Sequence, residues 1–424
     1  MNKKTIFFFI RRFNDIDHIT PIVYKFFKTT DHRLVVICLN QGYDLLNDFR
    51  IVYLRETLNV SVHYFHDYYN PSLKGRVLSR FLKYGYSNNK LSPFRLFRKL
   101  VGNKRIQRLI HDVYNDGWAD KLIQFARPDA LVFDWVKKEQ HMVGSFINAA
   151  KLNNIPTISV PHGFSLIVNE IRRNKEAEDN KPASRGELYN HFDKFVVQFD
   201  SYKKLCVKTG LPEDKVAVLG SARYCKEWRA INKTILPRQN ERVFRQKEKL
   251  KVVFMEYPYN YRIHQDRVKT AIMKVGELDF VDLVIKPHTR ANKLYEHDLN
   301  AAGFIAYDTP SMTLCQMADI VIGIQSSVLL EPLLEEKILV YPKYFHENTM
   351  LFETMGTCWQ VNDDNELINA LKKMYKEPDF KPYAQSKVKD LVVSTVNGGK
   401  ESPDILANYV SYIESVSNQG KDLN

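Results

Sequence analysis

The chain has 424 residues, of which 62 are Lys or Arg and 49 are Asp or Glu, and its formal net charge is +13. Hydrophobic residues make up 44% of the sequence, which excludes an intrinsically disordered chain and leaves room for two domains with separate cores. No run reaches the roughly 18 apolar residues that a membrane-spanning helix needs, and the positive charge favours an anionic partner.

The N-terminus predicts a buried strand and not a secretion signal. The apolar part of residues 1–10 is too short for a signal peptide, Arg11 and Arg12 interrupt it, and no cleavage site follows. We therefore expect a cytoplasmic protein. The five cysteines are scattered through the chain without a C-x-x-C pair, which predicts buried free thiols and neither disulfides nor a zinc site.

Short apolar runs alternate with helical patterns in the first half of the chain. The pattern predicts strands at residues 4–10, 33–39, 60–65, 127–135, 155–160, 195–198 and 216–220. Because helical stretches separate these runs, and long stretches of alternating polar and apolar residues are absent, we expect a doubly wound parallel sheet.

A polar, charged interval at residues 226–250 ends this series and predicts a connector between domains. A second series of apolar runs follows, at residues 251–256, 283–285, 304–307, 320–322, 338–341 and 359–361. The sequence therefore predicts a second α/β domain. The tail ends in a helical pattern at residues 403–415.

Residues 319–342 have the pattern of a buried strand, a polar turn, a short helix and a second buried strand. Ser326 or Ser327 can cap the helix, and the N–H groups at its start can bind an anion. Glu331 lies one turn further on, within reach of a sugar hydroxyl. The same pattern also fits an ordinary capped helix of an α/β domain.

A second polar motif, Lys286-Pro287-His288, ends another predicted strand. Ligands of parallel sheets bind beyond the carboxyl ends of the strands, so we expect Lys286 and His288 on the same rim as the two serines. An imidazole beside hydroxyl groups suits a nucleotide phosphate without any metal.

These motifs resemble the phosphate-binding His and Ser-Ser motifs of GT-B glycosyltransferases that use CMP- or CDP-activated donors. That group includes bacterial sialyltransferases, CDP-glycerol polymerases and the Kdo transferases of capsule and lipopolysaccharide assembly. The segment Val160-Pro161-His162-Gly163 resembles the strand-end P-H-G of the same transferases, and Gly220-Ser221-Ala222-Arg223 resembles their Gly-Ser-x-Arg segment. In the family a proline follows the histidine, whereas here Thr289 follows His288.

The resemblance implies the GT-B architecture, in which two Rossmann-like domains have parallel sheets facing a central cleft. We expect an acceptor-side domain at residues 1–225, a linker at 226–250 and a nucleotide-sugar-binding domain at 251–400. The remaining residues, 401–424, are expected to form a helix that packs back on the first domain.

Further residues receive candidate roles from their positions. Asp134 ends a strand and can act as base or nucleophile, although a strand-terminal Asp can also cap the next loop. His162 can transfer a proton, or it is an ordinary turn histidine. Arg223 and Arg290 suit a donor carboxylate or phosphate, since guanidinium binds both groups bidentately. Glu256, which ends the first strand of the second domain, can contact nucleotide or sugar.

The resemblance implies a glycosyltransferase that transfers a sugar acid from a CMP-activated donor to a cell-surface polysaccharide. Kdo is the sugar acid we expect first, and the polysaccharide is either lipopolysaccharide O-antigen or capsule. Alternatives are a CDP-glycerol or CDP-ribitol phosphotransferase and an enzyme like UDP-GlcNAc 2-epimerase. We expect no cofactor and no metal. Asp15 and Asp17 form a D-x-D pair, but they follow the first strand and lie outside the nucleotide motifs.

Residues 71–110 contain eleven Lys or Arg and no Asp or Glu, with apolar residues between them. This composition predicts contact with an anionic membrane surface, at the inner face of the cytoplasmic membrane, or with a saccharide acceptor that is lipid-linked. A solvated basic face and a nucleic-acid site are the alternatives. We expect no nucleic-acid partner.

Overall fold

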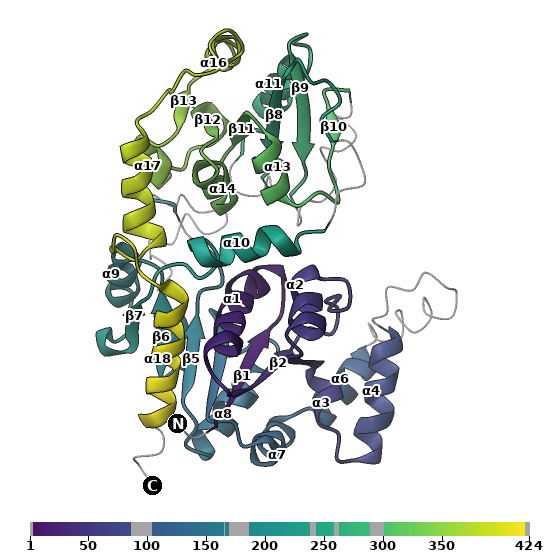
Figure 1. The fold of residues 1–424 in the computed structure, drawn as a ribbon. Coiled ribbons are helices and arrows are strands. Elements are labelled where there is room, and N and C mark those ends of the chain that lie inside the picture. The colour runs from purple at the N-terminus through teal and green to yellow at the C-terminus, as the bar shows by residue number, and fades with distance from the viewer. Residues whose placement is uncertain are drawn as a thin grey trace, which may run out of the picture. The chain divides into compact units, whose positions relative to one another are not determined.

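The computed structural model describes residues 3–85, 104–164, 166–168, 186–237, 243–257, 263–288 and 301–419. The chain forms two compact units. Unit 1 comprises Met1–Gly163, Lys181–Ile235 and Val393–Asn424, and unit 2 comprises Phe164–Asn180 and Leu236–Val392. Each unit is built on its own parallel sheet with helices around it (Figure 1). The prediction of two Rossmann-like α/β domains is confirmed.

The sheet of unit 1 has seven strands in the order β3-β2-β1-β4-β5-β6-β7, and all neighbouring pairs are parallel. The strands are β1 (Thr5–Ile10), β2 (Arg33–Cys38), β3 (Ser61–Tyr64), β4 (Ala130–Asp134), β5 (Thr157–Val160), β6 (Lys194–Val197) and β7 (Val216–Val218). The central strands are continuous apolar runs because helices cover both of their faces. The strand order reverses between β1 and β4, and ligands of such sheets bind at this point.

Ten α-helices of unit 1 lie in the described part of the chain. They are α1 (Phe13–Thr29), α2 (Phe49–Val52), α3 (Phe65–Tyr68), α4 (Leu73–Gly85), α6 (Lys104–Val113), α7 (Asp116–Ala126), α8 (Val143–Leu152), α9 (Asp200–Lys208), α10 (Lys226–Ile235) and α18 (Ile405–Gln419). Short helical turns are η1 (Tyr53–Thr57), η2 (Glu187–Tyr189), η3 (Glu213–Lys215) and, at the boundary of the units, η7 (Val392–Val396).

Two of these helices bring distant parts of the chain into the core of unit 1. Helix α18 buries Leu406 and Tyr409 in the same cluster as the apolar face of α1, and the Tyr409 hydroxyl donates to the Gly220 carbonyl at 3.0 Å. The interval expected to be a connector begins with α10, whose Trp228 is buried with its ring 5.8 Å from that of Tyr24. Residues 226–235 therefore belong to unit 1.

The sheet of unit 2 has six parallel strands in the order β10-β9-β8-β11-β12-β13. The strands are β8 (Leu250–Met255), β9 (Val281–Lys286), β10 (Phe304–Ile305), β11 (Ile320–Gly323), β12 (Ile338–Pro342) and β13 (Trp359–Val361). The helices are α11 (Gln265–Gly276), α13 (Ser311–Met317), η5 (Ser327–Leu329), α14 (Leu330–Leu334), η6 (Lys343–Phe345), α15 (Leu351–Thr354), α16 (Asp364–Lys376) and α17 (Gln385–Leu391). Here the strand order reverses between β8 and β11.

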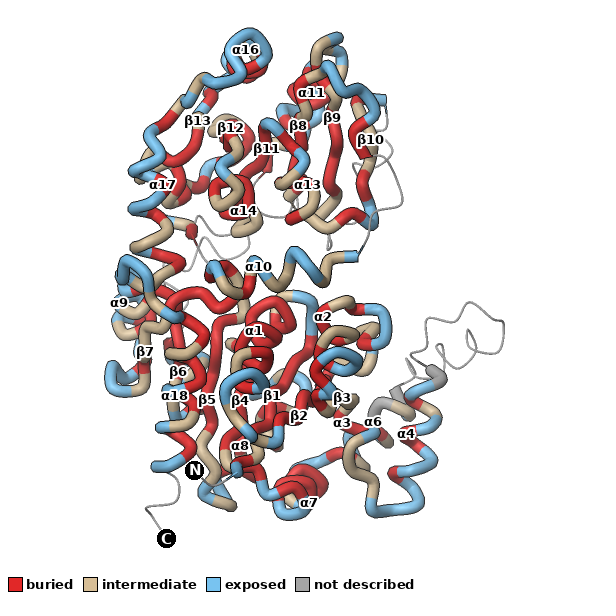
Figure 2. The backbone as a smooth tube through the Cα atoms, viewed as in Figure 1, coloured by how far each residue is buried: buried red, intermediate tan, exposed pale blue. Residues whose placement is uncertain are grey.

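Burial follows the strands and the inner faces of the helices in both units (Figure 2). The five cysteines are buried free thiols, as predicted. No helix among the residues placed by the structure is long and apolar enough to cross a bilayer.

Replacing Leu406 by alanine should destabilise unit 1 by about 2–5 kcal/mol, because the fully buried side chain leaves a cavity in the core. Denaturant unfolding of the full chain measures the change. Leu152→Ala is the matched control: this leucine on α8 is 76% exposed, and the loss should stay within about 0.5 kcal/mol. Equal effects of the two substitutions would contradict a structural role for α18.

Candidate functional site

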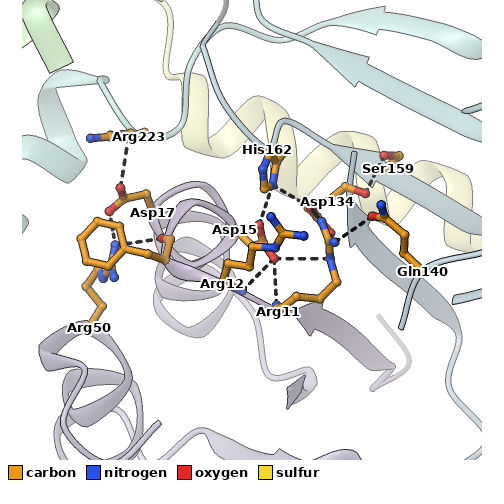
Figure 3. Close-up of polar contacts among 11 residues, drawn as sticks. Arg11, Arg12, Asp15, Asp17, Arg50, Asp134, Gln140, Ser159, His162 and Arg223 are labelled. Atoms are coloured by element: carbon orange, nitrogen blue, oxygen red, sulfur yellow. Dashed lines mark hydrogen bonds and ion pairs between the residues drawn. The ribbon is translucent and has the colours of Figure 1, made fainter. Parts of the chain in front are cut away.

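Four polar residues meet at the carboxyl ends of three neighbouring strands of unit 1 (Figure 3). Arg11 follows β1 directly, and Asp15 lies in the first turn of α1, the helix that β1 leads into. Asp134 is the last residue of β4, and His162 lies two residues beyond the end of β5. Because β4 lies between β1 and β5, the sheet brings these side chains together at its switch point.

The imidazole of His162 contacts two carboxylates with one ring nitrogen. Its Nδ1 lies 2.5 Å from Asp15 Oδ1 and 2.8 Å from Asp134 Oδ2. Both aspartate side chains are at most 1% exposed, whereas that of His162 is 25% exposed. The histidine is therefore the member of the group that a bound molecule can reach most easily.

Arg11 holds the carboxylates from the other side. Its Nε donates to Asp134 Oδ1 at 3.1 Å, and its Nη2 donates to Asp134 Oδ2. The backbone N–H groups of Arg11 and Arg12 donate to Asp15 Oδ2 at 2.8 and 3.0 Å. Both oxygens of Asp134 thus have partners, and Asp15 also occupies the first turn of α1, where a helix favours negative charge.

These contacts decide the charge of each group. Burial by itself would lower the pKa of His162, but the hydrogen bonds and charges of Asp134 and Asp15 outweigh it and raise the pKa to about 9. Burial would raise the pKa of Asp134, but His162 and Arg11 hold it at about 2. Burial and the charge of Asp134 raise the pKa of Asp15 in spite of His162 and Arg11. At neutral pH His162 is a cation that can donate a proton.

Asp15 and Asp17, the D-x-D pair of the sequence, have different partners. Asp17 Oδ1 accepts from Nη1 of the buried Arg50, and Asp17 Oδ2 lies 3.1 Å from Arg223 Nη1. The two carboxylates do not share one site. Arg223, predicted to bind a donor carboxylate or phosphate, pairs with Asp17 and keeps 19% of its side chain exposed.

Asp15, Asp134 and His162 bring ligand atoms within 4.8 Å of one another, a spacing that a metal ion could use. The Arg11 guanidinium already places a positive charge on both oxygens of Asp134. The charged His162 is a second cation beside Asp134, so a metal ion would be a third positive charge at this carboxylate and would be repelled by the other two. Metal independence stays a prediction for this site.

Unit 2 places its predicted residues at the ends of three adjacent strands. Glu256 follows β8, His288 lies two residues beyond β9, and Ser326 and Ser327 follow β11. Glu256 Oε2 accepts from the backbone N–H of His288 at 3.1 Å, which ties the ends of β8 and β9 together. Ser326 caps the helix with its Oγ 3.3 Å from the Val328 nitrogen.

The other predicted residues of unit 2 have different positions. Lys286 points toward the end of β10, where its Nζ donates to the carbonyls of Ala306 at 3.1 Å and Tyr307 at 2.6 Å. Burial lowers the pKa of Lys286 to about 8, although the charge of Asp308 opposes this. Glu331 is buried on α14, and Arg290 lies outside the described residues.

Sequence reasoning did not assign Arg11 and Asp15 to this site. A local signal exists for Asp15, since an acidic residue in the first turn of a helix that directly follows the first strand of a parallel sheet lies at the ligand-binding rim. No comparable signal exists for Arg11, because its partner Asp134 is 123 residues away.

No family model and no curated protein matches the chain. Several solved structures share its fold. S. aureus MnaA with UDP has 13% identity and a TM-score of 0.55 over 97% of both chains. The UDP-GlcNAc 2-epimerase of Neisseria meningitidis, bound to UDP-GlcNAc, has 9% identity and a TM-score of 0.54 over 97% of this chain and 100% of that one. A glycosyltransferase from Rickettsia africae has 14% identity and a TM-score of 0.54 over 98% of this chain and 99% of that one.

These matches define the class of fold: two Rossmann-like domains of the GT-B type, as in UDP-GlcNAc 2-epimerases. They support a fold of the GT-B type and not a Kdo transferase in particular. At 9–14% identity the likeness is one of fold, and a shared fold does not imply a shared reaction.

Replacing His162 by glutamine should destabilise the protein in a pH-dependent way. With a folded pKa of about 9 against an ordinary value of about 6.5, the charged histidine stabilises the fold fully below pH 6.5. Its contribution is lost as the pH rises through 9. Denaturant unfolding of wild type and variant at several pH values measures the difference, which should be largest at the acid end of this window.

The control for this experiment is His111→Gln, a substitution at an exposed position on α6. It should change the free energy of unfolding little at any pH. A difference between wild type and His162→Gln that is constant or grows between pH 6.5 and 9 would contradict a charged His162 between the two aspartates.

Proposed function

We propose that the protein is an enzyme that acts on a nucleotide-activated sugar. Unit 2 binds the nucleotide, and unit 1 supplies the proton donor. One observation carries the proposal: each sheet has polar side chains gathered at its switch point, the ligand-binding position of doubly wound sheets. The solved S. aureus and N. meningitidis neighbours, which hold UDP and UDP-GlcNAc, support a nucleotide sugar as substrate.

In unit 2, the hydroxyls of Ser326 and Ser327 and the imidazole of His288 bind the phosphate. Glu256 and Glu331 supply carboxylates for hydroxyl groups of ribose or sugar. His288 is held in place at its backbone by Glu256, and its ring lies edge-on to Tyr257 with centroids 5.9 Å apart. The position of these groups on three adjacent strand ends supports a single phosphate-containing ligand.

In unit 1, His162 is the catalytic residue. As an imidazolium it donates a proton to the oxygen that gains charge when the bond between sugar and phosphate breaks. Asp134, predicted as base or nucleophile, has both oxygens engaged by Arg11 and His162. We assign it to keeping His162 charged and oriented, with Asp15 as the second carboxylate.

Two reactions fit this division of roles. The fold neighbours favour isomerisation of the UDP-GlcNAc 2-epimerase kind, and we place it first. The second candidate is transfer of a sugar acid such as Kdo from CMP to a saccharide acceptor. It is favoured by the P-H-G segment around His162 and by the Gly-Ser-x-Arg segment that ends in Arg223. Transfer breaks the bond between the sugar and the nucleotide phosphate and moves the sugar to the acceptor. Epimerisation inverts C2 and keeps that bond in the product, so it uses the same proton donor if the C2 proton and the nucleotide are eliminated together and are then added back.

Replacing Ser327 and His288 together by alanine should weaken nucleotide binding by about tenfold or more, because two groups that contact the phosphate are lost. Calorimetry with UDP, CMP and CDP measures the affinity and identifies the base. Ser386→Ala, at an exposed position on α17, is the control and should bind as the wild type does. Unchanged affinity of the double variant for every nucleotide would exclude this site.

Product analysis separates the two reactions. Incubation with UDP-GlcNAc alone should yield its 2-epimer if the protein is an isomerase. Consumption of CMP-Kdo only in the presence of a saccharide acceptor would establish transfer instead. If the wild-type protein, in which His288 and the two serines are intact, turns over neither UDP-GlcNAc nor CMP-Kdo, both proposed reactions are contradicted.

His162→Gln should lower turnover by about 10²–10⁴-fold while nucleotide affinity is kept, because general acid catalysis contributes on this scale. For the wild type the rate should be steady at neutral pH and fall as the pH rises through about 9, where His162 loses its proton. Initial rates against pH measure this. A rate that rises through pH 9 would show that the neutral histidine acts as a base.

A further inference from the structure

Helix α4 exposes a face that is both apolar and basic. Leu73 and Val77, four residues apart on one side of the helix, are 72% and 61% exposed. Four exposed basic residues share the helix with them: Lys74, Arg76, Arg80 and Lys83. Helix α4 contains no acidic residue.

The opposite face fixes α4 to unit 1. Leu78 and Leu82 are buried, and Ser79 Oγ donates to Asp67 Oδ1 at 2.7 Å. The hydroxyl of Tyr114, which follows α6, donates to the Gly75 carbonyl at 3.3 Å. The buried face therefore settles the rotation of the helix, and Leu73 and Val77 point outward because the inner positions are filled.

Helix α6 lies beside α4 and extends the basic character (Figure 1). Arg105 and Arg108 on α6 are exposed. In the sequence, no Asp or Glu occurs between Asp67 and Asp112. The charge of α4 and of residues 104–111 of α6 is thus of one sign, and Asp112 is an acidic residue in the last turn of α6.

We propose that the exposed face of α4, together with the basic residues of α6, binds the surface of a lipid bilayer that contains anionic lipids. Aliphatic side chains enter the boundary between headgroups and acyl chains, while the surrounding cations contact the anionic headgroups. A nucleic acid would use the cations but gain little from Leu73 and Val77, since bases stack on aromatic and not on aliphatic side chains. The combination favours the bilayer.

The proposed bilayer-binding surface lies on α4 and α6, whereas the candidate site lies at the carboxyl ends of β1, β4 and β5. Binding to a bilayer would therefore be independent of the reaction that the protein catalyses. A protein held at the bilayer in this way would act next to lipid-linked molecules.

Flotation of the full-length protein with vesicles tests the proposal. Vesicles of phosphatidylcholine with phosphatidylglycerol should carry the protein upward, and vesicles of phosphatidylcholine alone should not. Added salt should weaken the binding, since it screens the headgroup charge. Equal recovery with both kinds of vesicle, or no recovery with either, would overturn the proposal.

Matched variants locate the surface. Arg76→Glu with Arg80→Glu should lower the partition coefficient on anionic vesicles by about tenfold or more. Lys204→Glu with Lys208→Glu, at exposed positions on α9, changes the net charge by the same amount and should retain most of the binding. If both double variants lose the same amount of vesicle binding, the anionic vesicles are attracted by the net charge of the whole protein and not by α4.

The apolar part is tested in the same assay. Leu73→Ser with Val77→Ser should also lower recovery, whereas Leu152→Ser, at an exposed position on α8, should not. All substituted side chains are exposed, and thermal unfolding checks that each variant is folded. If the Leu73 and Val77 substitutions have no effect while a single-stranded oligonucleotide binds tightly, the surface is a nucleic-acid site and the proposal is wrong.

Discussion

The buried charges at the end of β4 impose the strictest constraint on unit 1. Asp134 and Asp15 are almost fully removed from water, and a buried carboxylate is costly unless it is paired. Arg11 and His162 supply two positive charges for the two negative ones. Loss of any one member leaves an uncompensated charge in the core. The proton on His162 is therefore part of the fold as well as the group proposed to act on substrate.

The two sheets use the same strand order and place different chemistry at the same position. In both, the third, second, first and fourth strands of the unit lie side by side in that order, so residues after the first and fourth strands become neighbours. Unit 1 fills this position with paired charges. Unit 2 has the carboxylate of Glu256 and the hydroxyls of Ser326 and Ser327. The fold thus provides the place, and the residues at the strand ends differ between the units, which is why we propose different roles for them.

The turn that presents the two serines is held by its surroundings. Gln325 has a φ of +51°, a left-handed backbone conformation that is uncommon for a residue with a side chain. The buried side-chain amide of Asn348 donates to Gln325 Oε1 at 2.8 Å. The Asn348 carbonyl in turn accepts from Lys343 Nζ at 2.8 Å, and Lys343 pairs with Glu353. These contacts reach from η6 and α15 to the loop after β11, so the orientation of Ser326 depends on residues that follow it in the sequence.

The sequence by itself determined the strands of both sheets and the rim on which the polar residues lie. Strands buried on both faces are continuous apolar runs, so parallel sheets can be recognised locally, and Asp134, His162, His288 and Ser326 follow such runs. Only the tertiary structure decided which of these residues meet. Arg11 contacts Asp134 because β1 and β4 are neighbours in the sheet, and the pairing of strands far apart in the chain leaves no local pattern. The same reason explains why α10 joins the core of unit 1, although its residues were expected to connect the domains: an amphipathic helix has an apolar face, but its sequence does not say which surface will cover it.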